Sequence, residues 1–207
     1  MKKFFMAAAI MGIVTSGMAQ KDSWYIGGNV GFSSKKDKVE AGSTTVDGTK
    51  TTSWTFSPEI GTFLTNNWQV GVGLNIGGAK TDPNSTGSTV STTTRYGGTL
   101  YTRYFFGTGA FRPFLGANAT VLPGKIKNTI GNTSTELQSF NFGINGNAGF
   151  AYALAKRVTA VGSLGVLGFE HTSNKAKGSD VKTKTNSFGL DANSLGNRFT
   201  IGVYYTL

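Results

Sequence analysis

Five charged side chains are the residues of this sequence that could most readily form a functional site. Spaced along the chain between small and polar neighbours, they are Glu59, Arg95, Arg103, Arg112 and Arg198. If they project into one enclosed space, the carboxylate must pair with guanidinium groups, because buried charges have to be paired or hydrated. We expect a polar plug in which Glu59 bridges two or more arginines. The alternatives are a narrow hydrated path that prefers anions and a contact at one mouth of that space.

The composition excludes several other kinds of site. The 207-residue chain has no cysteine and only one histidine, His171. Disulfide scaffolds, cysteine nucleophiles and metal centres with several histidine ligands are therefore excluded. The glycine-rich pieces alternate with other residues and lack the Lys-Ser/Thr ending of a phosphate loop. We expect neither a cofactor nor a metal.

Two-residue alternation of apolar and polar side chains predicts the strands that position the charges. The clearest segment runs from Trp68 to Ile76, with apolar residues at even positions and glycine or polar residues between them. Similar segments begin at Trp24, Trp54, Tyr96, Phe111, Phe140 and Phe199. Segment 158–171 changes parity near residues 161–164, which indicates a bulge or an unassigned register. On the alternating parities, the five charged residues all point inward.

Residues 1–19 have the pattern of a cleaved signal peptide. Lys2 and Lys3 precede an apolar run from Phe4 to Val14, and small residues lead to Ala19. We expect cleavage after Ala19, which leaves residues 20–207 as one barrel domain. No later apolar run approaches the roughly 20 residues of a spanning helix.

Short and long connections alternate between the predicted strands. The tight turns are 64–67, 107–110 and 155–157, and the long polar segments are 34–50, 80–92, 123–138 and 172–187. This asymmetry is typical of a membrane barrel with short periplasmic turns and long extracellular loops. Aromatic residues at the strand ends form two belts at the expected interfaces. Because lipid tolerates no open sheet edge, we expect a closed, antiparallel up-and-down β-barrel of eight strands, or ten if a long loop folds as a hairpin.

The last eight residues resemble the C-terminal assembly signal of outer-membrane barrels. Thr200, Gly202, Tyr205 and Leu207 occupy its four specified positions, with leucine where phenylalanine is usual. The resemblance implies recognition by the barrel-assembly machinery. Residues 20–207 resemble the small eight-stranded outer-membrane barrels related to OmpX, OmpW and the transmembrane half of OmpA, which implies a place in the cell outer membrane. Met18-Ala19-Gln20 resembles the cleavage site of exported Bacteroidota proteins.

A short stretch resembles an enzyme motif. His171-Thr172-Ser173-Asn174 is similar to the His-x-Ser-Asn stretch of outer-membrane lipid A deacylases. That resemblance implies a serine nucleophile activated by histidine, with Asp180 or Asp191 as the carboxylate that orients the ring. Neither aspartate has the spacing of the family's glutamate, and a four-residue match arises easily in a Ser/Thr-rich region.

Lysines concentrate in two of the long segments, in a chain with 20 basic and 10 acidic side chains. They are Lys35, Lys36, Lys38, Lys50, Lys175, Lys177, Lys182 and Lys184. Flexible lysines near an outer rim can pair with the anionic sugars and phosphates of lipopolysaccharide. The alternative is a solvated surface that resists aggregation. Nucleic-acid binding fits poorly, because no aromatic side chains are interleaved with these lysines.

Three functions remain open from the sequence. The first is a non-enzymatic barrel with a structural role or a surface contact, whose extracellular ligand is unknown. The second is a narrow porin for small solutes. The third is a lipid A-modifying esterase.

Overall fold

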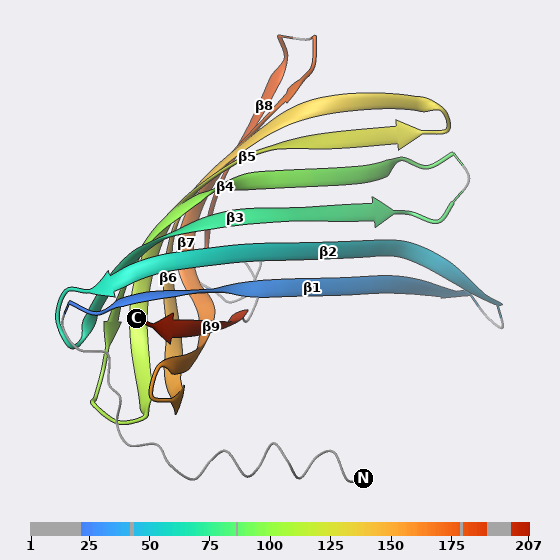
Figure 1. Ribbon diagram of the computed structural model, residues 1–207. Helices are drawn as coiled ribbons and strands as arrows, with labels where there is room; N and C mark the ends of the chain where they lie inside the picture. Colours follow the sequence, from blue (N-terminus) through green and yellow to red (C-terminus); the bar gives the residue numbers. More distant parts are fainter. Residues whose placement is uncertain (1–21, 42–43, 86, 179, 190–199) are drawn as a thin grey trace.

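A computed structural model describes residues 22–41, 44–85, 87–178, 180–189 and 200–207 of the chain. These residues form nine strands of one antiparallel sheet (Figure 1). The strands are β1 (Trp24–Ala41), β2 (Thr44–Phe63), β3 (Trp68–Asp82), β4 (Val90–Phe105), β5 (Phe111–Ile130), β6 (Thr133–Ala155), β7 (Val158–Ala176), β8 (Lys182–Gly189) and β9 (Thr200–Thr206). No helix in the described part of the chain is long and apolar enough to cross a bilayer.

The sheet closes through its last strand. Each of β1 to β6 pairs with the next strand along the chain, and β9 pairs with both β1 and β7. Figure 1 shows β9 beside the first part of β1, close to the C-terminus. β8 pairs with the part of β7 that β9 does not cover, so β8 and β9 together take the eighth position around the barrel. The expected closed, antiparallel eight-stranded architecture is confirmed.

The strands extend into the long polar segments expected as loops at one end of the barrel. β5 ends at Ile130 and β6 begins at Thr133, so segment 123–138 is a continuous hairpin. Gly131 has the positive φ of +55° that such a tight turn requires. The threonine-rich composition explains the difference, because β-branched residues favour paired, extended backbone. The hairpins extend existing strands.

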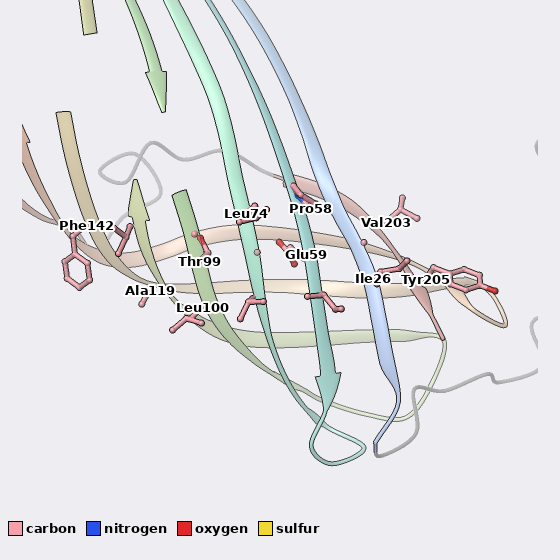
Figure 2. A pocket seen from close by; sticks show the side chains of 16 residues that line it. Ile26, Pro58, Glu59, Leu74, Thr99, Leu100, Ala119, Phe142, Val203 and Tyr205 are labelled. Carbon is pink, nitrogen blue, oxygen red and sulfur yellow. The ribbon is translucent and has the colours of Figure 1, made fainter. Parts of the chain in front are cut away.

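Apolar side chains cover the outer face of the barrel. Leu74 and Leu100 are 60% and 63% exposed, and the aromatic residues of both expected belts are also exposed. At the barrel's waist these outward side chains line a broad, shallow apolar pocket. Figure 2 shows several of them around this pocket, among them Ile26, Leu100 and Phe142. This surface suits contact with lipid rather than with water.

The seventh strand contains the expected irregularity. Gly146 of β6 pairs with Leu167 and Asn147 pairs with Gly165, which leaves Val166 as an extra residue in β7. Val166 and Leu167 are consequently both exposed, although they are adjacent in sequence. The bulge lies slightly beyond the stretch in which the apolar parity changes. Because the bulge takes up one extra residue, the side chains of β7 alternate between the inward and outward faces both before and after it.

Candidate functional site

Aromatic rings fill the lumen at the end of the barrel that carries the short turns. The buried rings belong to Tyr25, Phe63, Tyr101, Phe105, Phe114 and Tyr204. Tyr25 contacts Phe63 and Tyr204 edge to face, with ring centroids 5.9 Å and 5.3 Å apart. Phe105 joins Phe63 to Phe114, with centroid distances of 5.8 Å and 5.2 Å. We call these six residues the aromatic plug.

Inward-facing glycines make room for the plug. Tyr25 pairs in register with Gly61, and Tyr101 pairs with Gly71. A Cβ atom on Gly71 would lie 2.5 Å from the Tyr101 hydroxyl oxygen and 2.7 Å from the Ile60 carbonyl oxygen. The rings therefore occupy the space that the side chain of any residue other than glycine would fill at these positions of the neighbouring strands. At the plug, this need for space explains why glycines are frequent at inward-facing positions.

Arg103 lies against the plug and hydrogen-bonds to one of its residues, Tyr204, and to two polar side chains beside it. Its Nη1 donates to Gln69 Oε1 at 3.2 Å and to the Tyr204 hydroxyl at 3.0 Å. Its Nη2 forms an ion pair with Glu59 Oε2 at 3.2 Å. The Tyr204 hydroxyl donates to the same carboxylate oxygen at 2.6 Å. The guanidinium carbon lies 4.3 Å from the centre of the Tyr101 ring, so the cation is also stabilised by an aromatic face.

Of the five charges expected to form one cluster, the described structure brings together only Glu59 and Arg103. Arg112 donates to the Asn66 carbonyl oxygen at 2.7 Å and lies over the Phe105 ring, at the short-turn end. Arg95 is exposed in the outer half of the barrel, eight residues or about 26 Å along β4 from Arg103. Arg198 lies outside the described residues. Of the described arginines, Glu59 therefore pairs with Arg103 alone, and Tyr204 takes the second place that we expected an arginine to fill.

A polar cavity of about 200 Å³ lies above the plug. Ser57 Oγ donates to Asn75 Oδ1 at 3.0 Å, and Asn75 Nδ2 donates to Thr99 Oγ1 at 2.7 Å. Thr99 in turn shares a hydrogen bond of 2.9 Å with Thr120. This ladder across β2 to β5 lines the cavity with neutral amides and hydroxyls. Among the described residues that line it, the only ionised side chains are Glu59 and Arg103, which neutralise each other.

Sequence reasoning missed the aromatic part of the site. The alternation that begins at Trp24 puts Tyr25 on the inward face, but it does not show that this ring meets Tyr101 and Tyr204. The available signal was the coincidence of inward tyrosines with inward glycines on strands that must be neighbours. Gln69 also escaped notice, although it is 3% exposed and bonded to Arg103.

The residues of the enzyme-like motif do not form a catalytic arrangement. His171 and Ser173 face outward, opposite Phe142 and Phe140. His171 Nδ1 is hydrogen-bonded to Asn186 Oδ1 at 2.6 Å, so an amide occupies the place of the orienting carboxylate. Ser173 is 4% exposed, and its Oγ has no hydrogen-bond partner among the described residues.

Neither aspartate proposed for the motif orients His171 in the described structure. Asp180 receives a hydrogen bond from Lys175 at 3.4 Å, and Asp191 lies outside the described residues. The described part of the chain also contains no group of three or more His, Asp or Glu side chains that could hold a metal ion.

The residues of the C-terminal signal complete the barrel seam. Thr200 shares a hydrogen bond of 2.8 Å with Ser163 of β7, and the Leu207 amide donates to the Trp24 carbonyl oxygen at 2.9 Å. Tyr205 faces outward and accepts a hydrogen bond from Arg157 at 3.2 Å. Gly202 pairs with Asn29 of β1 and Val161 of β7. Their recognition during assembly stays a prediction.

Comparison with known families identifies the architecture. A model described as "Outer membrane protein beta-barrel domain" matches residues 5–194. The chain belongs to this family. This outer-membrane barrel is accordingly located in the cell outer membrane, as the resemblance implied. No curated protein matches the sequence.

Solved structures of outer-membrane proteins are similar to this barrel. OprG from Pseudomonas aeruginosa is 15% identical with a TM-score of 0.51, and the match covers 92% of this chain and 98% of OprG. Ail of Yersinia pestis is 14% identical with a TM-score of 0.40, covering 91% and 99% of the two chains. Neisserial surface protein A is 16% identical with a TM-score of 0.37, covering 89% and 97%. At these identities the likeness to OprG supports the fold alone.

Proposed function

We propose that this outer-membrane barrel is a sealed, non-enzymatic protein with a structural or surface-contact role in the cell envelope. The observation that carries the proposal is the aromatic plug. A barrel of eight strands has an interior that side chains can fill, and here six aromatic rings and Arg103 fill its periplasmic end. A solute entering from outside would reach the polar cavity and stop there.

The two alternatives have weaker support. A narrow porin would need the plug to move, which would break the bonds from Arg103 to Gln69, Tyr204 and Glu59 together. An esterase would need Ser173 exposed to lipid and bonded to His171, whereas its hydroxyl is buried and unpaired among the described residues. The proposed partners are outer-membrane lipid, including lipopolysaccharide, and the barrel-assembly machinery during insertion.

Conductance in planar bilayers tests the sealed barrel. We expect no channel steps from the wild-type protein, because no water-filled path crosses the plug. The matched variant Tyr25→Ala with Tyr101→Ala should conduct, since it removes two rings that meet in the lumen. Channel steps from the wild-type protein would contradict the proposal.

Lipid A composition tests the non-enzymatic part of the proposal. Cells that express the wild-type protein and cells that express Ser173→Ala should show the same lipid A mass spectrum. Deacylated lipid A that appears with the wild-type protein and disappears with Ser173→Ala would support the esterase instead.

A further inference from the structure

Three lysines lie together on the outward face above the outer aromatic belt. The register across β2 to β5 sets two adjacent rows of side chains there. The lower row contains Trp54, Gly78, Thr94 and Lys125, and the upper row contains Thr52, Lys80, Thr92 and Lys127. We call Lys80, Lys125, Lys127 and the threonines Thr92 and Thr94 the lysine collar. Lys80 and Lys127 flank Thr92 on neighbouring strands, with backbones about 10 Å apart.

Aromatic and apolar side chains lie directly beneath the collar. Trp54 and Tyr96 are 47% and 57% exposed on the outer face. The indole Nε1 of Trp54 lies 2.9 Å from the place where a Cβ atom on Gly78 would stand, so the ring extends across β3 below Lys80. Further down, Leu74 and Leu100 belong to the apolar wall of the waist (Figure 2). The outer face thus changes from apolar through aromatic to cationic within a few residues.

Two of the three collar lysines have no ion pair with a carboxylate of the described residues. Four of the eight lysines singled out in the sequence are paired with carboxylates. The pairs are Lys35 with Asp37, Lys36 with Asp47, Lys175 with Asp180 and Lys177 with Glu136. Lys80 of the collar is also paired, with Asp82 at 3.7 Å. The exposed Lys125 and Lys127 form no ion pair with the described residues, because Glu136, which lies opposite Lys127 on β6, is paired with Lys177. Their charges are therefore available to a partner.

We propose that the lysine collar binds the phosphorylated headgroup of a glycolipid in the outer leaflet, with the acyl chains on the apolar wall below. Ammonium groups attract phosphate, and the threonine hydroxyls can donate to and accept from sugar hydroxyls. The aromatic belt places the collar at headgroup depth. The site deepens the surface-contact role proposed above, and it uses residues other than the lysines that the sequence singled out.

The lysines of β8 and the adjoining part of β7 are less suited to this ligand. Lys182 and Lys184 of β8 lie beside Lys175 and Ser173 of β7. As in the collar, one of the three lysines is paired with a carboxylate, here Lys175 with Asp180, but the Ser173 hydroxyl among them is buried and cannot reach a sugar. Phe169 and Phe188, which have no polar atoms to meet a headgroup, lie beneath this group. It therefore provides a matched control with the same number of positive charges.

Retention of lipid A in nanodiscs tests the collar. The full chain would be reconstituted in phosphatidylcholine with lipid A, and bound lipid A would be counted by native mass spectrometry. Lys80→Gln, Lys125→Gln and Lys127→Gln combined should weaken retention by roughly tenfold to a hundredfold, because each lysine near an anionic surface contributes about 1 kcal/mol. The combination of Lys175→Gln, Lys182→Gln and Lys184→Gln should retain lipid A nearly as the wild type does. Heat-modifiable migration shows that each variant is folded.

Further arms distinguish the ligand chemistry. Dephosphorylated lipid A, phosphatidylglycerol and inorganic phosphate should each bind the wild-type protein much more weakly than lipid A. Equal losses in the two triple variants, or equal binding of any of these three probes, would overturn the proposal. Conductance of the same samples keeps the two ideas separate. Channel steps with intact lipid A retention would refute the sealed barrel alone, whereas a silent barrel that retains no lipid A would refute the collar alone.

Discussion

The hydroxyl groups of Tyr25 and Tyr101 lie 2.6 Å apart, although two other strands separate β1 from β4 in the sheet. The intervening strands carry Gly61 and Gly71 in the same row, so both rings can lie flat over them and meet in the lumen. This hydrogen bond links β1 and β4 through the lumen. It links residues that are 76 positions apart in the sequence.

The first prediction concerns the space above Gly71. Gly71→Ala should destabilise the barrel by about 1–3 kcal/mol, because the added methyl group would overlap the Tyr101 hydroxyl and the Ile60 carbonyl oxygen. Gly165→Ala is the control, since no atom lies within 4 Å of its added Cβ. Urea unfolding in lipid vesicles measures both. Equal midpoints for the two variants would show that the glycine does not make room for the ring.

The second prediction concerns the buried ion pair. Glu59→Ala should cost roughly 3–5 kcal/mol, because Arg103 would remain buried without its carboxylate. Glu136→Ala removes a carboxylate from an exposed pair with Lys177 and should change stability little. The comparison uses urea midpoints at equal slope. An unchanged midpoint for Glu59→Ala would mean that the guanidinium is hydrated in solution.

The third prediction concerns depth on the lipid face. Leu74→Arg should cost about 2–4 kcal/mol, because Leu74 faces lipid at the waist of the barrel. Asn75→Ser, on the inward face, should cost about 1 kcal/mol, since the amide joins Ser57 to Thr99. Reversible unfolding in vesicles gives both values. If Leu74→Arg left the stability unchanged and Asn75→Ser lowered it strongly, the two faces of the strand would be the reverse of those in the structure.

The fourth prediction separates assembly from stability. Tyr205→Ala with Leu207→Ala should impair assembly in cells, where the side chains are read as a signal, but leave refolding into detergent nearly intact. The reason is that the Leu207 amide keeps its bond to Trp24, and the pairing of β9 is made by the backbone. Thr206→Ala is the control. Outer-membrane yield and heat-modifiable migration measure assembly, and a normal cellular yield of the double variant would refute the signal.

The fifth prediction concerns the outer hairpin. Lys36 donates to Asp47 at 2.6 Å and thereby lowers the pKa of this carboxyl below its ordinary value of 3.8. Because the folded-state pKa is the lower one, the contact stabilises the hairpin at neutral pH and is lost as the pH falls through that pKa. Lys36→Gln should move the Asp47 titration upward, whereas Lys35→Gln should move it less. Carboxyl chemical shifts from NMR give the titration, and an unshifted Asp47 in Lys36→Gln would contradict the contact.

The sequence determined the outward surface and the architecture of this protein. Leu74, Leu100 and Trp54 could be assigned to the lipid face because a strand alternates its side chains with a period of two, and lipid tolerates only apolar residues there. The same rule placed Glu59, Arg103 and Arg112 inside.

Only the tertiary structure decided which inward residues meet. Alternation assigns a face but not a height along the barrel, and height depends on the stagger of strands that pair far apart in the sequence. Arg95 and Arg112 share the inward face with Arg103 but lie at other heights. Tyr204, 101 positions from Arg103, lies at the same height and bonds to it. The extended hairpins could not be predicted from the sequence either. A polar, threonine-rich segment is compatible with a loop and with a strand until its partner strand is known.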